Sequence, residues 1–136
     1  MTLLQMHLVA ASAWLGLVAA EAVIELTAKD RATRQFVAEA HKKIDLLFEG
    51  PLVAIVLLTG SVLLYRVWPD VSPLMLGKIA LGLVAVVANI ICIKWVVGRA
   101  RAKDDDEFFG YARKISLSGY TIPLAVLALV IGLYGG

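Results

Sequence analysis

Four long apolar runs, at residues 3–26, 51–65, 74–93 and 115–134, restrict what this chain can fold into. A helix needs about 20 apolar residues to cross the hydrocarbon core of a bilayer, and membrane barrels show short alternating strands instead. With 60% hydrophobic residues, the chain has too few polar groups to cover a soluble domain of its size. The sequence predicts an all-α integral membrane protein, a bundle of four transmembrane helices forming a single domain over residues 1–136.

Basic residues are distributed unevenly among the predicted loops. The first and third loops and their flanks hold 11 of the 13 Lys and Arg residues, and the second holds only Arg66 and Lys78. The positive-inside rule then places the first and third loops in the cytoplasm and both termini on the outer side, most simply of a bacterial inner membrane. The net charge of +2 gives no reason to expect a nucleic acid. The expected partners are the lipid bilayer and, as an open alternative to a monomer, a homodimer or larger membrane complex.

The second apolar run is short for a membrane span. Its 15 residues from Pro51 make only roughly 22 Å of helix at 1.5 Å per residue. We therefore expect this helix to start near Asp45, which places Glu49 inside the membrane. In the fourth run, Pro123 has no N–H and is expected to leave the carbonyl of Gly119 without its helical partner.

Acidic and imidazole side chains recur at intervals of four in the first two predicted helices. Glu21 and Glu25 lie in the first, and His41, Asp45 and Glu49 lead into the second. Residues four apart lie on the same side of a helix, and antiparallel neighbours joined by a short loop bring these residues into the same leaflet. Ionisable groups at bilayer depth usually face the bundle interior and mark a functional site. The two stripes are predicted to approach one another.

These five residues are our candidate metal ligands, because carboxylate and imidazole groups on facing helices suit a divalent transition metal. Carboxylates crowded at low dielectric also suit a proton relay. The alternative is that basic side chains of the same leaflet simply pair with the acids. The candidates for that pairing are Arg34, Lys42, Lys43 and Lys114.

Two further polar residues, His7 and Lys78, fall in the predicted outer half of the bundle. A lysine buried without a carboxylate partner favours contact with an anion, such as the propionate of a porphyrin. A five-coordinate haem on His7 is one interpretation, with Trp14 two turns further along the same helical face. The alternatives are that His7 is interfacial, that Lys78 snorkels to the headgroups and that Trp14 only packs in the core.

A small set of residues resembles the four-helix, haem-associated protoporphyrinogen IX oxidase family. They are His7, Trp14, Gly16, Pro51, Gly60 and Lys78. The resemblance implies a haem b or another porphyrin as cofactor, with His7, Trp14, Lys78 and the residue at position 89 as its contacts. There is a looser likeness to the membrane domain of copper-resistance protein D.

The sequence also departs from that oxidase pattern. Asn89 stands where the family has a histidine 11 residues after the lysine, and residues 120–123 read Tyr-Thr-Ile-Pro in place of Asn-Glu-x-Pro. His7 and His41 belong to opposite leaflets, so they cannot ligate the same iron. The resemblance thus implies a shared architecture rather than a shared activity, and membrane oxidoreductase activity stays open.

Two functions are predicted from these patterns. One is a membrane-embedded redox or porphyrin-handling protein, and the alternative is a cation or proton binding or transport protein that uses the acidic cluster. No nucleotide loop, nucleophile elbow or zinc-ligand spacing is present in the sequence. The single Cys92 excludes a dithiol mechanism within one chain.

Overall fold

The computed structural model describes residues 1–134, which contain helices and no strand. In chain order the elements are α1 (Leu3–Thr27), α2 (Arg31–Ile44), the π-helix η1 (Asp45–Glu49), α3 (Gly50–Val67), α4 (Pro73–Ala100), α5 (Asp105–Ser118), the 3₁₀ turn η2 (Gly119–Thr121) and α6 (Ile122–Tyr134). The predicted all-α fold class is confirmed for this part of the chain.

Four continuous helical segments are long and apolar enough to cross a membrane. They are Leu3–Thr27, Arg31–Val67, Pro73–Ala100 and Asp105–Tyr134. Large apolar side chains on every one of them point outward, among them Val9, Leu58, Val87 and Leu127. Such a continuous apolar surface is unfavourable in water and suits a lipid environment.

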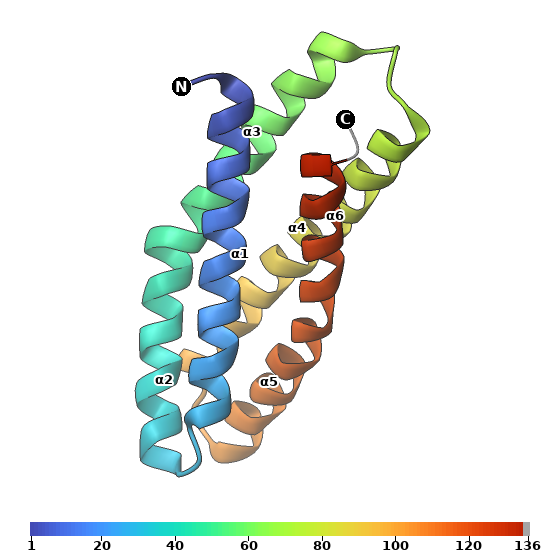
Figure 1. Cartoon of the computed structure of the whole chain (residues 1–136). Coiled ribbons are helices and arrows are strands. Elements are labelled where there is room, and N and C mark those ends of the chain that lie inside the picture. Colours follow the sequence, from blue (N-terminus) through green and yellow to red (C-terminus); the bar gives the residue numbers. More distant parts are fainter. Residues whose placement is uncertain (135–136) are drawn as a thin grey trace.

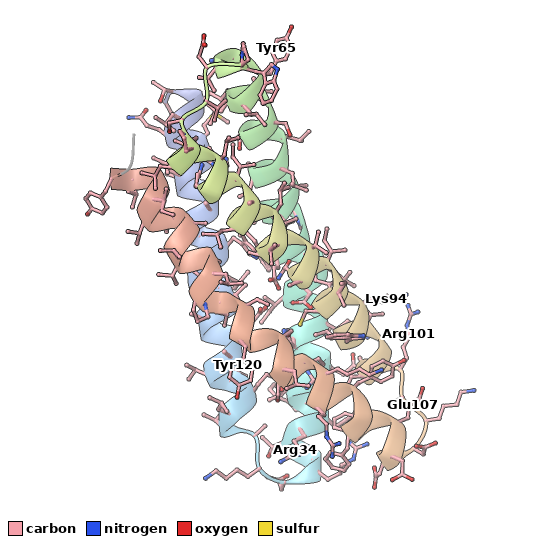
Figure 2. The ribbon with its side chains drawn as sticks, turned by 90° about the vertical axis from the view of Figure 1, so that its right-hand side faces the viewer. Arg34, Tyr65, Lys94, Arg101, Glu107 and Tyr120 are labelled. Atoms are coloured by element: carbon pink, nitrogen blue, oxygen red, sulfur yellow. The ribbon has the colours of Figure 1, made fainter. Side chains whose placement is uncertain are left out.

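The chain runs up and down through a bundle (Figure 1). α1 runs down in this view, and α2 runs up beside it. α3 continues α2 upward, and α4 then runs down along α6 and α5. The start of α1 and the end of α6 lie at one end of the bundle, and the α1–α2 and α4–α5 connections lie at the other. Figure 2 shows Arg34, Arg101 and Glu107 near these connections and Tyr65 at the opposite end.

Each span begins at a residue that can cap a helix. Thr2 and Gln5 form a reciprocal capping box at α1, and the side chains of Asp30, Ser72 and Asp104 accept backbone N–H groups at α2, α4 and α5. These bonds satisfy N–H groups that have no partner inside the helix. The second span therefore begins at Arg31. Our expectation that this span starts near Asp45 was wrong, because the capping residue is Asp30 and the amphipathic helix α2 precedes Asp45.

A π-helix interrupts the second span immediately before Pro51. The N–H of Gly50 bonds to the carbonyl of Asp45, five residues back, instead of four. In an α-helix, residues four apart overshoot a full turn by about 40°. The wider π turn offsets that rotation between Asp45 and Glu49. It keeps His41, Asp45 and Glu49 directed toward the same neighbours.

A second irregular turn precedes Pro123 in the last span. The N–H of Ile122 bonds to the carbonyl of Gly119 through the 3₁₀ turn η2. The carbonyl that we expected Pro123 to leave free therefore has a donor, because the backbone tightens by one residue there. The span itself starts at Asp105, ten residues before the apolar run.

Two groups of contacts join the helices. Trp14, Val53, Ala85 and Val86 form the buried apolar core in the middle of the bundle. Near the α1–α2 connection, the ring centroid of the buried Phe108 of α5 lies 4.0 Å from the guanidinium carbon of Arg31. Arg31 also pairs with Asp105 at 2.8 Å. Cation–π and ionic contacts thus attach α5 to α2 at this end.

We predict that Gly98→Ala destabilises the protein, because a Cβ at this position would lie 2.7 Å from Cζ of Tyr111 in α5. Overpacking of this kind typically costs about 1–3 kcal/mol. Gly77→Ala is the matched control on the same helix, since a Cβ there meets nothing within 4 Å. Equilibrium unfolding in detergent micelles measures both variants. Equal stabilities would show that α4 and α5 do not pack as described.

Candidate metal centre

Most of the buried polar side chains gather at one level of the bundle. Glu21 comes from α1, His41 from α2, and Asp45 and Glu49 from the π-helix, and all four are buried. We call these four residues the acidic site. Each offers one ligand atom, and the four atoms lie within 4.8 Å of one another. The structure thus brings both predicted stripes together.

The Nε2 atom of His41 faces two carboxylates of the acidic site. It lies 3.4 Å from Oδ1 of Asp45 and 3.6 Å from Oε2 of Glu21. The 20 Å³ recess beside this group is lined by Glu21, His41 and apolar side chains of α1 and α2. The imidazole therefore directs Nε2 at the carboxylates of Asp45 and Glu21, and the recess beside it is otherwise apolar.

The other imidazole nitrogen is held by Glu25. Nδ1 of His41 lies 2.5 Å from Oε1 of Glu25. Arg99 of α4 binds both oxygens of the same carboxylate, with Nη1 2.8 Å from Oε2 and Nη2 2.5 Å from Oε1. When Nδ1 donates its proton to Glu25, the lone pair of a neutral imidazole is on Nε2. Glu25 is thus a positioning group behind His41 rather than a member of the acidic site.

Several oxygens of the acidic site have no hydrogen-bond partner among residues 1–134. They are both carboxylate oxygens of Asp45 and Oε1 of Glu21, and all three are fully buried. Burying such groups without a partner is costly. The acidic site and Glu25 hold four carboxylates, whereas Arg99 and a protonated His41 supply two positive charges. The group is therefore suited to receive further protons or a cation.

Glu49 has two N–H donors that our sequence interpretation assigned to a porphyrin. The indole Nε1 of Trp14 donates to Oε1 of Glu49 at 3.2 Å, and the amide of Asn89 donates to the same oxygen. Trp14 belongs to α1 and Asn89 to α4. The structure places both residues beside the acidic site rather than beside His7.

The two remaining porphyrin candidates lie elsewhere. Nδ1 of His7 is 2.9 Å from the hydroxyl oxygen of Thr59, and a Cβ on Gly60 would lie 3.1 Å from the imidazole Cε1. The ring of His7 therefore packs closely on the backbone of α3. The methylene chain of Lys78 lies against Gly132 of α6. A role for either residue in binding haem stays a prediction.

The basic residue that neutralises Glu25 is one that sequence reasoning counted only as a loop charge. Arg99 is 3% exposed and lies in the last turn of α4. Of the four basic residues expected to pair with the acids, Lys42 binds Glu39 at 2.9 Å, and Arg34 lies over the ring of Phe109. The only available signal was that residues 3–26 and 45–65 contain carboxylates but no Lys or Arg, so a partner for these acids had to come from elsewhere.

We predict that Arg99→Gln lowers the free energy of unfolding by about 3–5 kcal/mol, because it leaves the partly buried Glu25 carboxylate without its partner. Arg101→Gln is the matched control: Arg101 is exposed two residues later, and its substitution is expected to change stability by less than about 0.5 kcal/mol. The double variant Glu25→Gln/Arg99→Gln should regain part of the loss. Equilibrium unfolding in detergent measures the stability of each variant. An Arg99→Gln variant as stable as Arg101→Gln would contradict the ion pair between Arg99 and Glu25.

Comparison with protein-family models, with curated proteins and with solved structures finds no match to this chain. The resemblance to the oxidase family accordingly stays an expectation. The acidic site is interpreted from its own geometry.

Proposed function

We propose that this protein binds a divalent transition-metal cation inside the bundle, through Glu21, His41, Asp45 and Glu49. The observation that carries the proposal is the arrangement around His41. Its Nε2 faces two carboxylates with unpartnered oxygens, while its Nδ1 is held by Glu25. Histidines that ligate metals commonly donate their second ring N–H to a carboxylate in this way.

The separations between the candidate ligand atoms fit a small cation. Metal–nitrogen and metal–oxygen bonds of about 2.0–2.2 Å place the ligands of a tetrahedral site roughly 3.4 Å apart. Nε2 of His41 is 3.4 Å and 3.6 Å from its two carboxylate neighbours. One imidazole with three carboxylates favours Mn²⁺, Fe²⁺ or Zn²⁺ over a soft ion such as Cu⁺.

The balance of charge supports a cation as well. A divalent ion compensates the carboxylates that Arg99 leaves uncompensated. Protons alone would neutralise the acids too, which is the alternative reading of the same cluster. A proton needs only one oxygen, however, and gives no reason for four ligand atoms to converge within 4.8 Å. We therefore favour the metal over the proton.

The setting of the site suits a protein that binds a cation on its way through a membrane. The acidic site lies within two of the four candidate spans. We further propose the bacterial inner membrane, with the α1–α2 and α4–α5 connections in the cytoplasm, because the basic residues concentrate at that end. The site then lies in the cytoplasmic half of the protein.

We predict that Mn²⁺ or Zn²⁺ added to chelator-treated protein raises its thermal stability. At a metal concentration of 100 times Kd, the expected gain is about 2.7 kcal/mol. Glu21→Gln, Asp45→Asn and Glu49→Gln should each abolish most of this gain. Glu39→Gln, two residues before His41 and with a 43% exposed side chain, is the control that should keep it.

The unfolding temperature of the metal-free variants provides a second test. Asp45→Asn removes a carboxylate from a buried group in which acids outnumber bases, and neither of its oxygens has a hydrogen-bond partner within the described part of the chain. The variant should therefore unfold at a higher temperature than the metal-free wild type. Stability gained without metal and lost response to metal together indicate a binding site rather than a structural cluster. Equal metal responses in wild type and Asp45→Asn would overturn the proposal.

The redox interpretation has its own measurement. If His7 holds a haem, the purified protein has a Soret band that shifts on reduction with dithionite, and His7→Ala abolishes it while Glu21→Gln keeps it. A protein without this band that responds to Mn²⁺ is what the metal proposal expects. A band that depends on His7 would restore the porphyrin function as the first hypothesis.

A further inference from the structure

A cavity of about 50 Å³ lies between α1, α4, η2 and α6, beside the acidic site. Its polar lining comes from Asn89 and Cys92 of α4, Ser118 of α5 and Thr121 of η2. The rest of the lining is apolar. A cavity that offers a water polar partners holds it once about 10–15 Å³ is open to it. This cavity therefore has room for more than one water.

The polar walls of the cavity offer acceptors. The hydroxyl of Ser118 donates to the carbonyl of Ile115 at 2.6 Å, and its oxygen lies 3.1 Å from the sulfur of Cys92. The hydroxyl of Thr121 donates to the carbonyl of Ser118 at 2.7 Å. Each hydroxyl oxygen keeps lone pairs, and Oδ1 of Asn89 is buried without a partner. The ligand that such walls favour is a water or a cation, not an anion.

Two side chains connect this cavity to the acidic site. Trp14 and Asn89 both line the cavity, and both donate to Oε1 of Glu49. The amide of Asn89 thus points its nitrogen at the carboxylate, while its oxygen has no partner. A cation in the cavity would lie against the side chain of Asn89, whose amide nitrogen binds the Glu49 carboxylate.

We propose that this cavity is a hydrated transit site, in which a divalent cation is held by water and by the oxygens of Asn89, Ser118 and Thr121 before it enters the acidic site. The proposal rests on the proposed function. It adds the path and names Asn89 as the residue shared by the two sites. The hydroxyl and amide oxygens fit a hard, partly hydrated ion.

The first experiment asks whether cations reach the cavity at all. Cys92 is the only cysteine and lies in the cavity wall, so Ag⁺ added to the protein in liposomes should bind one ion per chain. Intact mass spectrometry counts the silver ions bound per chain, and Cys92→Ser is the control variant that should bind none. Ala88→Leu and Ala125→Leu fill the cavity from α4 and α6 and should slow the reaction at least tenfold. Ala80→Leu, exposed on the same helix α4, should not change it.

The second experiment follows Mn²⁺ by stopped flow in the same proteins. An obstructed path slows association and dissociation by the same factor, so both rates should fall about tenfold in the two filled variants while Kd stays within twofold of the wild type. Ala125→Leu carries the test if Ala88→Leu does not fold. Filled variants with unchanged rates would overturn the transit site.

The two experiments separate failure of the inference from failure of the proposed function. Equal silver rates in Ala88→Leu, Ala125→Leu and Ala80→Leu overturn the hydrated cavity, even where Mn²⁺ binds the acidic site. Wild-type protein that binds no Mn²⁺ but shows the silver pattern overturns the metal function and the transit role, while the cavity stands as a water-filled space open to cations.

Discussion

The two-point contact between Arg99 and Glu25 is the interaction on which the candidate metal centre depends. It joins α4 to α1 and holds the carboxylate that fixes His41. Buried ion pairs contribute little net stability after desolvation, but removing one partner is costly. The pair therefore acts mainly by setting the geometry. With Glu25 committed to Arg99, His41 directs Nε2 at the acidic site.

The backbone around the acidic site departs from regular helix where the ligands require it. Pro51 cannot donate an N–H, and the π turn before it brings Glu49 into line with His41. Irregular backbone is tolerated at membrane depth where it is buried in protein. The polar groups are then surrounded by apolar helices, which makes their mutual compensation more important than it would be at a surface.

Much of this architecture could be predicted from hydropathy and spacing. The four spans follow from the apolar runs, and the interval of four placed His41, Asp45 and Glu49 on one side of a helix. Periodicity identifies a face but not what the face meets, since helix rotation depends on packing against neighbours. Arg99 and Asn89 come from α4, far away in sequence, so their contacts with Glu25 and Glu49 could not be read from local patterns.

The bond between Trp14 and Glu49 connects the acidic site to a chromophore. Indole emission responds to nearby charge and to hydrogen bonding at its N–H, so the electrical state of the site is coupled to ultraviolet fluorescence without any label. The other two tryptophans lie apart from the core, with Trp68 exposed next to the α3–α4 connection. The protein therefore carries an intrinsic optical reporter at the place where its buried charges meet.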